Sequence, residues 1–472
     1  MTEEDKIVWA LSSNKVVTIG SKDVYRYPPY ELLILGLYAP QDIRVKRWRS
    51  TGLWQHPDFV KLWSAHTISE FGSRITREGL PLLGVITLGA SPGEMALLGV
   101  AGVAPVIVVG LLAGVWVDRL HRRPILIITD LGRALLLLAI PLLALLSQLQ
   151  MWHLYVIAAL VGVLTVFFNV ADQSYLPFLV GREQVVEGNS KLGVSSSVAE
   201  VGGPPMAGVL VQLITAPFAI LLDALSFLAS AIFVGSIRAP EPPIVASEER
   251  PHFLRSIAEG ANVLLRNPLL RPLAAVTAMW NFFGGFFGTL ITLYAIRDLH
   301  LTSGIWGLLV GAGGVGSLIG AIFTLRISRR FGVGPTIIIT YALTGALGLF
   351  IPLAGGSLPV ASILIFIPQF FGDMMATVYG INERSLRQSI TPDHLLGRTN
   401  ASMHFIAGGL NTFGLLVGGV LGDALGPRST LLIAVIGIML ATLWLVFSPL
   451  WKLREVQVEE TAISELARSI KT

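Results

Sequence analysis

The chain of 472 residues contains no cysteine and few charged side chains. Without cysteine it can form neither a disulfide framework nor a thiolate metal site, and redox chemistry gives no hint of the compartment. Charged residues make up only 14% of the sequence, whereas a soluble domain usually contains about a quarter. Because lipid-facing helices need no charge, this shortage favours a membrane protein.

Motifs of ATP-driven pumps and hydrolytic enzymes are also missing. The sequence contains no Walker GxxxxGK[ST] loop and no HExxH metal motif. The glycine-rich GAGGVG at 311–316 lies inside an apolar run, where it indicates close helix packing and not a phosphate loop. The net charge of +4 is small and spread over short loops, which argues against nucleic acid as a partner. We therefore expect no enzyme, no catalytic residues, no metal and no bound cofactor.

Hydrophobic residues are abundant, at 53% of the chain, and the mean hydropathy is +0.69. A helix needs roughly 20 mostly apolar residues to cross the hydrocarbon core, and about twelve windows of this kind occur. The sequence therefore predicts an all-α membrane protein with about twelve transmembrane helices. The expected spans are 59–88, 95–117, 124–147, 152–178, 188–214, 217–237, 270–296, 304–327, 333–354, 358–382, 399–423 and 429–450.

Basic residues are distributed unevenly between the two sets of connections that alternate along these spans. The second set holds chiefly Arg297 and Arg428. The basic residues in or beside the first set of connections are Arg119, Arg122, Arg123, Arg182, Lys191, Arg238, Arg250, Arg255, Arg266, Arg271, Arg326, Arg329, Arg330, Arg384, Arg387 and Arg398. By the positive-inside bias the first set is cytoplasmic, and an even number of spans then leaves both termini in the cytoplasm.

The connection between the sixth and seventh spans is the longest and divides the chain into two halves. Its proline-rich start and amphipathic centre predict a linker with a surface helix. A GxxxG pattern precedes a basic turn at both Gly110 and Gly316, and VGGPPMAG at Val201 is similar to VGGVLGDA at Val417, so we expect two six-helix bundles with pseudo-two-fold symmetry. The expected parts are an N-terminal cytoplasmic extension (1–57), a first bundle (58–237), the linker (238–269), a second bundle (270–450) and a cytoplasmic tail (451–472).

The first 57 residues differ in character from the rest of the chain. ELLILGLYAP at 31–40 is apolar but too short to span a bilayer, and RVKRWR at 44–49 is able to meet anionic lipid. No basic start leads directly into an apolar stretch that ends at small residues, so we expect no cleavable signal peptide. The segment is either a cytoplasmic extension, partly disordered, or the product of a start codon placed too early.

The loop after the second span carries a recognisable pattern. GVWVDRLHRRP at 114–124 resembles the signature loop of the major facilitator superfamily, roughly G-x-x-x-D-R-x-G-R-R, with His121 in place of the second glycine. DLGRALLL at 130, LLDALSFLASA at 221 and ITPDHLLGRTNA at 390 are similar to the drug-exporter branch that contains macrolide-efflux and enterobactin-exporter proteins. The resemblance covers about residues 58–450, and it implies a transporter that works by alternating access.

The signature loop is expected to work as a gate. Asp118, at the cytoplasmic end of a helix, is able to accept charge-assisted hydrogen bonds or to face the N-terminus of a helix from the other half. The resemblance implies that such a loop latches the cytoplasmic gate in the outward-open state; alternatively, its arginines merely anchor the topology. The gating residues are Gly114, Asp118, Arg119, Arg122, Arg123, Asp130 and Arg133, the last two as gate support.

The first span contains the densest group of intramembrane charges, in HTISEFGSRITREGLP at 66–81. His66, Glu70, Arg74 and Arg77 recur at helical spacing and share one face, and charges at this depth are functional candidates. Glu70 is able to bond Arg74, which leaves Arg77 or Glu78 for a partner on another helix. Such a chain could bind an anionic group or relay protons, or it could be a buried ion-pair lock between helices.

In the fifth span, Glu200 precedes VGGPPMAG, which resembles a variant of the family's antiporter motif. A lone carboxylate at mid-membrane is suited to proton coupling, because desolvation favours its protonated form. The alternative is a structural hydrogen bond to a neighbouring helix. The small residues allow close packing and a kink, and the helix-packing candidates are Gly202, Gly203, Pro204, Pro205 and Gly208.

Further polar groups lie at membrane depth elsewhere. Asp172, Asp373 and Glu383 are candidate cavity or gate groups, whereas Asp223 is expected to cap or pair locally. WNFFGGFFGTL at 280–290 could line an apolar pocket, with Trp280, Phe283 and Phe287 on one face and Asn281 supplying polarity; a helix interface or a lipid face is the alternative.

Together these patterns predict a secondary active transporter of the inner or plasma membrane. We expect it to export amphipathic small molecules, drug-like or siderophore-like, in exchange for protons, with the lipid bilayer and a small-molecule substrate as partners and a monomer as the working unit. Uptake or flipping of a metabolite or lysophospholipid is an alternative, since the sequence does not specify the direction of transport. A non-transporting receptor or scaffold is a further alternative, although it would not need a charge cluster within the membrane.

Overall fold

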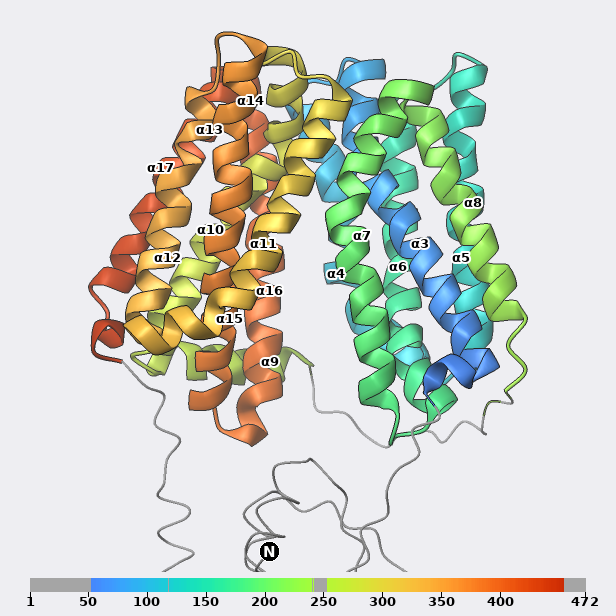
Figure 1. Cartoon of the computed structure of the whole chain (residues 1–472), viewed down its shortest axis with the longest axis horizontal. Coiled ribbons are helices and arrows are strands. Elements are labelled where there is room, and N and C mark those ends of the chain that lie inside the picture. The colour runs from blue at the N-terminus through green and yellow to red at the C-terminus, as the bar shows by residue number, and fades with distance from the viewer. Residues whose placement is uncertain (1–51, 118, 240, 242–252, 454–472) are drawn as a thin grey trace, which may run out of the picture. The chain divides into compact units, whose positions relative to one another are not determined.

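The computed structural model describes residues 52–117, 119–239, 241 and 253–453. Within these residues every regular element is a helix (Figure 1). The described residues before Pro57 belong to a separate unit, Met1–His56, and include a short turn of 3-10 helix at Leu53–Gln55. The following paragraphs concern the described residues from Pro57 onward.

The N-terminal half consists of six helical rods. They are α3 (Pro57–Leu82) with its π-helical end η2 (Leu83–Thr87), α4 (Pro92–Val117), α5 (Arg122–Leu145), α6 (Met151–Val180), α7 (Val185–Ile214) and α8 (Ala216–Gly235). Helix α3 lies between α7 and α8, while α5 packs on α6 and α8. The C-terminal residue of α6 is followed by Gly181, whose positive φ allows the abrupt turn into α7.

The C-terminal half repeats this plan. Its rods are α10 (Leu270–Leu293) with η3 (Tyr294–Asp298), α11 (Ser303–Phe331), α12 (Val333–Gly348) with α13 (Phe350–Leu353), α14 (Leu358–Ile367) with η4 (Pro368–Gly372) and α15 (Asp373–Ile390), α16 (Asp393–Leu425), and α17 (Pro427–Val446) with a final turn η5 (Pro449–Lys452). Ten of the helical rods in the described part of the chain are long and apolar enough to cross a membrane, and α3 and α4, with 26 residues each, complete the expected twelve.

The first rod of each half ends in the same backbone feature, a π-helical turn. The π-helical turns η2 and η3 each end at a residue whose N–H bonds the first carbonyl of the turn, at 3.2 Å in η2 and 3.0 Å in η3. Each turn is followed by a residue with positive φ, Gly89 (65°) in the first half and His300 (54°) in the second. A recurring backbone conformation of this kind indicates an internal repeat, and it agrees with the predicted all-α fold of two related bundles.

The predicted spans agree with the rods except around the tenth and eleventh. The tenth span was expected at 358–382, but its rod continues to Ile390, and the eleventh rod begins at Asp393, not at 399. The helices continue past the apolar core because their polar ends remain good helix formers, and Thr391, in an extended conformation before Pro392, separates them.

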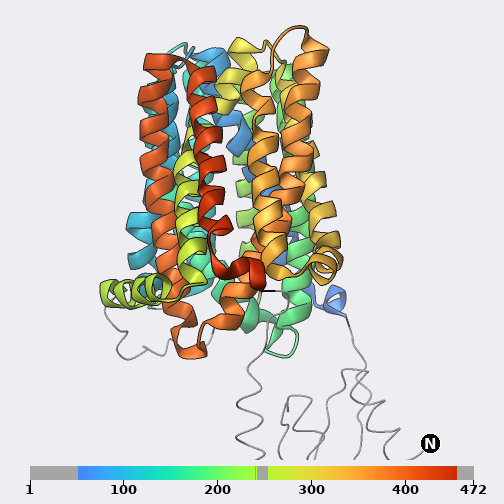
Figure 2. The same ribbon diagram turned by 90° about the vertical axis from the view of Figure 1, so that its left-hand side faces the viewer.

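The amphipathic helix expected in the linker is α9 (Phe253–Arg266), which lies across the ends of the rods (Figure 2). It packs against α16 and α10. Glu259 pairs with Arg398, and the Ser402 hydroxyl donates to the Ile257 carbonyl at 2.7 Å. The proline-rich start of the linker, at 242–252, lies outside the described residues.

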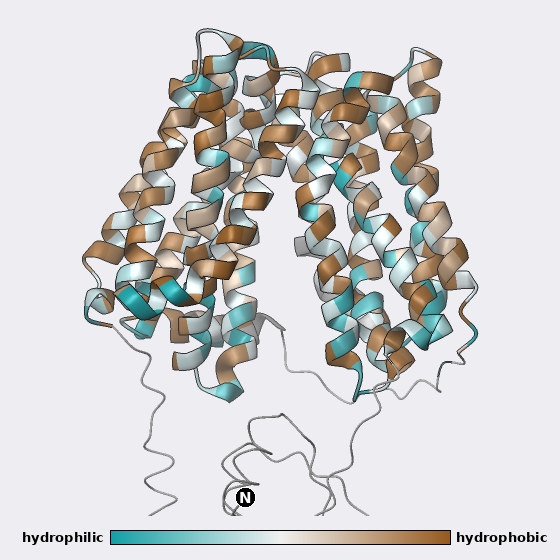
Figure 3. Cartoon of the chain, viewed as in Figure 1, coloured by the Kyte–Doolittle hydropathy of each residue, from teal (hydrophilic) through white to brown (hydrophobic). Residues whose placement is uncertain are grey.

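The rods have two ends, which we call upper and lower. The upper end holds the α3–α4, α7–α8 and α16–α17 connections, and the lower end holds α9 and the basic connections after α4, α6 and α11. In Figure 3, hydrophobic residues cover most of the rods, and hydrophilic residues gather toward the lower end. This distribution is what a bilayer around the middle of the rods requires.

The two halves meet at the upper end (Figure 1). Helix α7 packs along α11, and α4 packs along α16. A Cβ at Gly208 of α7 would overlap the Ser303 carbonyl of α11, so only glycine permits this approach. Near the same end, the Gln212 side chain accepts from the Gly304 N–H at 3.1 Å, and the Asp423 carboxylate accepts from the Gly93 N–H at 3.1 Å. These contacts close the upper end.

Candidate functional site

The predicted gating loop lies at the lower end of α4 and α5. Asp118 lies outside the described residues, so its expected latch contact is not described. Gly114 is in the last turns of α4, and Arg119 is exposed just beyond that helix. The positions of the two remaining basic residues, Arg122 and Arg123, are set by contacts that link α5 to α8.

These contacts connect the start of α5 with the end of α8. The backbone N–H groups of Arg122 and Arg123 donate to the two carboxylate oxygens of Glu241, at 2.8 and 2.6 Å. The Arg123 guanidinium donates to the Val234 carbonyl at 3.2 Å and to that of Gly235. A carboxylate therefore caps the N-terminus of α5 while an arginine caps the C-terminus of α8, and both charges match the helix dipoles.

Glu241 was not predicted from the sequence. Its side chain is only 7% exposed, and its Oε2 atom lies 3.4 Å from His121 Nδ1. The sequence carried no signal for this contact, because Glu241 and Arg122 are far apart in the chain and a single acid before two prolines is typical of any loop. Arg123 is consequently more than a topology anchor.

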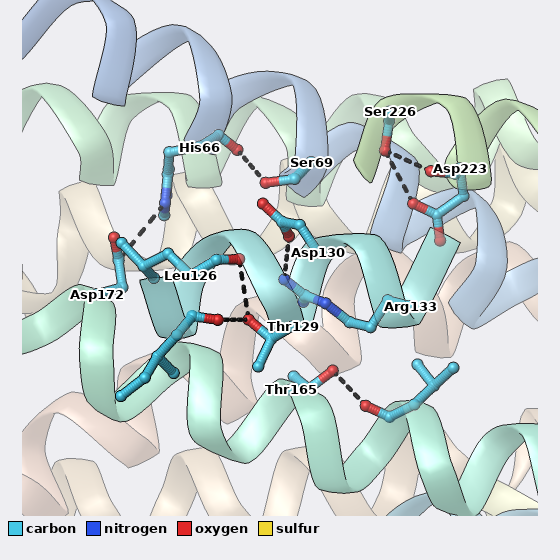
Figure 4. A network of polar contacts seen from close by, with 12 residues as sticks. His66, Ser69, Leu126, Thr129, Asp130, Arg133, Thr165, Asp172, Asp223 and Ser226 are labelled. Atoms are coloured by element: carbon cyan, nitrogen blue, oxygen red, sulfur yellow. Dashed lines mark hydrogen bonds and ion pairs between the residues drawn. The ribbon is translucent and has the colours of Figure 1, made fainter. Parts of the chain in front are cut away.

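The predicted gate-support pair is buried inside the N-terminal half (Figure 4). Arg133 Nη2 donates to Asp130 Oδ1 at 2.5 Å, and the two residues are 3% and 0% exposed. The guanidinium carbon lies 4.2 Å from the ring centroid of Phe168 on α6 and 4.1 Å from that of Phe227 on α8. A charge so completely enclosed ties α5 to both neighbours, since no water can replace its partners.

A second polar group joins α3 to α6 and α7. His66 Nδ1 lies 3.8 Å from Asp172 Oδ2, and its Nε2 atom lies 3.1 Å from Ser196 Oγ (Figure 4). Farther up α3, Gly72 faces Asp223 of α8, whose carboxylate accepts from the Ser226 hydroxyl at 3.0 Å. His66 and Asp172 therefore meet across helices, and Asp223 pairs locally as predicted.

The charges of α3 and α7 form one chain of ion pairs. Arg74 pairs with Glu200 and also lies 3.9 Å from Glu70, while Arg77 lies 3.9 Å from the other Glu200 oxygen. The side chains of Glu200 and Arg77 are 55% and 64% exposed, whereas Arg74 is 17% exposed. The expectation of a lone, desolvated carboxylate at Glu200 is wrong, because the long arginines of α3 reach across to it.

The glycines and prolines after Glu200 shape both faces of α7. A Cβ at Gly203 would overlap the Arg74 side chain, and one at Gly202 would contact the Phe71 ring at 3.7 Å. On the other face, Gly307 of α11 lies against the Pro204 carbonyl and Gly208, and Gly311 lies against the Pro205 ring. The small residues thus let α7 approach α3 on one side and α11 on the other.

A cavity of about 420 Å³ lies beside these charges, mostly within the C-terminal half. Three predicted residues, Glu78 of α3, Phe287 of α10 and Asp373 of α15, line it together with Trp280. The wall also contains polar and aromatic residues that the sequence did not single out: Thr292, Trp306, Thr344 and Gln369. They were missed because each is a single polar or aromatic residue in an apolar run, and only the packing of four rods brings them together.

Two predicted pocket residues do not line this cavity. The Asn281 amide donates to the Thr277 carbonyl of its own helix at 2.8 Å, and the Phe283 ring packs against Gly437 of α17. Of the residues on the predicted pocket face, Trp280 and Phe287 therefore line this cavity, whereas Asn281 and Phe283 do not. Phe283 occupies a helix interface, because Gly437 has no side chain and leaves room for its ring.

A second cavity of about 220 Å³ continues toward the lower end along α10 and α15. Trp280 and Thr344 line both cavities, and the second also has Tyr341 and Glu383 in its wall. Glu383 is buried and accepts from Arg387 Nε at 3.0 Å, and Arg387 also donates to Asn400 of α16. Glu383 is thus already paired. Among the described residues, no group of three or more His, Asp or Glu side chains could hold a metal ion.

Comparison with known proteins identifies the fold. The family model described as Major Facilitator Superfamily matches residues 62–410. The multidrug efflux pump Tap of Mycolicibacterium fortuitum is 28% identical over 402 residues, which is 82% of this chain and 94% of Tap. Macrolide efflux protein A of Streptococcus pyogenes is 26% identical over 227 residues, 48% of this chain and 55% of that protein.

Among solved structures, a bacterial homologue of the iron transporter ferroportin in an inward-facing state has a TM-score of 0.67 at 16% identity. The match covers 83% of this chain and 98% of the homologue. At this identity the likeness concerns the fold. Together with the twelve rods and the family match, it establishes that the chain is a multi-pass membrane transporter and not an enzyme, and that it belongs to the Major Facilitator Superfamily.

Proposed function

We propose that this transporter exports amphipathic small molecules, drug-like or siderophore-like, by alternating access. The observation that carries the proposal is the cavity of about 420 Å³, whose wall combines apolar, aromatic and carboxylate groups from both halves of the molecule. Such a lining suits ligands that are partly apolar and partly polar. The efflux activity in the names of Tap and macrolide efflux protein A supports export as the direction.

In this proposal the lower end faces the cytoplasm, and both termini lie there. The basic connections at the lower end support this orientation through the positive-inside bias. The closed contacts between α7 and α11 at the upper end then correspond to an inward-open state of a protein in the cell membrane. The working unit is a monomer with a small-molecule substrate and lipid as its partners.

We further propose proton antiport with Glu200 as the proton carrier. In its ionised form, the Glu200 carboxylate accepts from the Arg74 guanidinium. A proton that enters from outside and binds a Glu200 oxygen removes this ion pair, and Arg74 then turns to Glu70, whose carboxylate already lies 3.9 Å away. Because the pair joins α3 to α7, its loss loosens one contact within the N-terminal half each time a proton binds.

Export can be tested in cells that lack their own efflux pumps. The measurement is the accumulation of fluorescent cationic, neutral and anionic amphiphiles, with and without a protonophore, in cells whose membranes contain the protein. We expect lower accumulation of at least one class, and the protonophore should abolish the difference. Equal accumulation across the panel would contradict export of amphiphiles and favour a narrow metabolite or lipid carrier.

A variant of Glu200 tests its proposed role as the proton carrier. Glu200→Gln keeps the size of the side chain but cannot be ionised, so export should no longer depend on the pH gradient. Glu183→Gln, which changes an exposed carboxylate between α6 and α7, is the matched control and should behave like the wild type. Proton-driven export that is unchanged in Glu200→Gln would remove Glu200 from the coupling mechanism.

A further inference from the structure

The larger cavity contains two carboxylates that no hydrogen bond or ion pair holds among the described residues. Glu78 and Asp373 both line the larger cavity. Among the described residues, neither carboxylate has a hydrogen bond or an ion pair, and the described residues in the walls of both cavities include no Lys, Arg or His. The neighbouring arginines of α3, Arg74 and Arg77, are turned toward Glu200.

Asp373 is held in place by backbone geometry and not by a counter-ion. It begins α15, directly after the π-helical turn η4, and it lies against Gly313 of α11, where a Cβ would overlap its carboxylate. π-helical turns often mark functional sites, because they shift the side chains that follow. The turn and the glycine together place a carboxylate at the cavity wall.

An unsatisfied donor lies in the same wall. Trp306 is only 3% exposed, and its indole N–H has no hydrogen-bond partner within the described part of the chain. A buried donor without a partner is costly, so its presence in a cavity wall points to an acceptor supplied by a ligand. Trp280 and Phe287 line the same space, and the faces of aromatic rings attract cations.

We propose that the larger cavity is a binding site for amphipathic organic cations. In this site Asp373 and Glu78 face the positive charge, Trp280 and Phe287 contact the apolar body, and the Trp306 N–H donates to an oxygen acceptor of the ligand. The inference rests on the proposed export function, whose substrate class it names. Because Glu78 belongs to the N-terminal half and Asp373 to the C-terminal half, a bound cation is held by both halves at once.

Binding to the purified protein in detergent tests this site without requiring transport. The probes are tetraphenylphosphonium and tetraphenylborate, which have the same shape and opposite charge, and isothermal titration calorimetry gives both affinities. The wild type should bind tetraphenylphosphonium and should bind tetraphenylborate at least about tenfold more weakly. Equal affinities, or tighter binding of the anion, would overturn the proposal, and this comparison needs no variant.

Variants of the cavity residues test whether these residues bind the cation. Asp373→Asn should weaken tetraphenylphosphonium binding about tenfold and Glu78→Gln severalfold, whereas Glu183→Gln should leave it unchanged. Trp306→Phe keeps the ring and removes the N–H, so it should leave tetraphenylphosphonium unaffected and weaken rhodamine 6G, a cation that carries ester and ether oxygens. Thermal unfolding in the same detergent verifies that each variant is folded. Wild-type affinity in a folded Asp373→Asn variant would contradict the assignment.

Flux into proteoliposomes separates this inference from the proposed function. Charge-selective binding of tetraphenylphosphonium without transport of any amphiphile would support the cation site and contradict export. Conversely, the protein could transport neutral or anionic amphiphiles, fail to bind tetraphenylphosphonium, and show no competition by this cation. That result would support export and contradict the cation site.

Discussion

The paired charges inside the N-terminal half and the carboxylates of the larger cavity are two different arrangements of charge within the helical rods. In the N-terminal half, acids pair with bases: Arg133 with Asp130 within α5, Arg74 of α3 with Glu200 of α7, and His66 of α3 with Asp172 of α6. Asp373 of α15 and Glu78 of α3 both line the larger cavity, and the described residues of its wall include no base. Paired charges tie helices together, whereas unpaired carboxylates beside a cavity are available to a ligand.

The largest effect is expected from Arg133→Met. This change removes the partner of a fully buried carboxylate, and breaking such a pair costs about 3–5 kcal/mol of the free energy of unfolding. Thermal unfolding in detergent should show a clearly lower midpoint. The double variant Asp130→Asn with Arg133→Met should recover part of the loss, because no uncompensated charge remains. A single variant as stable as the wild type would mean that the pair does not hold the N-terminal half together.

The contact between the halves is the next most sensitive feature. Gly208→Ala adds a Cβ that would overlap the Ser303 carbonyl, so the upper end should no longer close as described. Overpacking of this kind costs about 1–3 kcal/mol. Crosslinking between cysteines introduced at the upper ends of α7 and α11 should fall. Gly193→Ala on the same helix has open space around the added atom and is the matched control; equal crosslinking in both variants would contradict the interpretation.

A smaller effect is expected at the lower end of the N-terminal half. Glu241→Gln weakens the charged cap on the N-terminus of α5, and the loss of a helix cap costs about 1 kcal/mol. Hydrogen exchange of the first turn of α5 should become faster while the middle of the helix is unaffected. Unchanged exchange at Arg122 and Arg123 would show that another group satisfies their N–H donors.

The smallest effect on stability is expected from Asp373→Asn. Since the carboxylate has no partner among the described residues, the free energy of unfolding should change by no more than about 0.5 kcal/mol. Comparison with Arg133→Met tests directly whether paired and unpaired charges differ in their effect on stability. A loss as large as that of Arg133→Met would indicate that Asp373 is a structural group.

Much of the fold could be predicted from the sequence. The apolar windows located the rods within a few residues, because a helix that crosses lipid must satisfy its own backbone and so needs a long uncharged run. The signature loop indicated the family that the comparison later established. The amphipathic pattern of the linker also predicted α9, since one apolar face needs a partner on the bundle.

The site was only partly predictable. Helical spacing correctly placed Glu70 near Arg74, since residues four apart lie on one face. Spacing could not show that Glu200 meets the same arginine or that Phe283 turns away from the cavity. Both outcomes depend on the rotation of one helix against another, which small residues such as Gly203 and Gly437 decide.

The sequence by itself therefore determined the membrane class, the twelve rods and the residues that carry charge at membrane depth. Only the tertiary structure decided which of these charges pair, that Glu241 caps α5, and that Glu78 and Trp306 share a cavity with Asp373. The physical reason is that hydropathy acts on each segment separately, whereas pairing and cavity walls depend on the packing of helices that are distant in the chain.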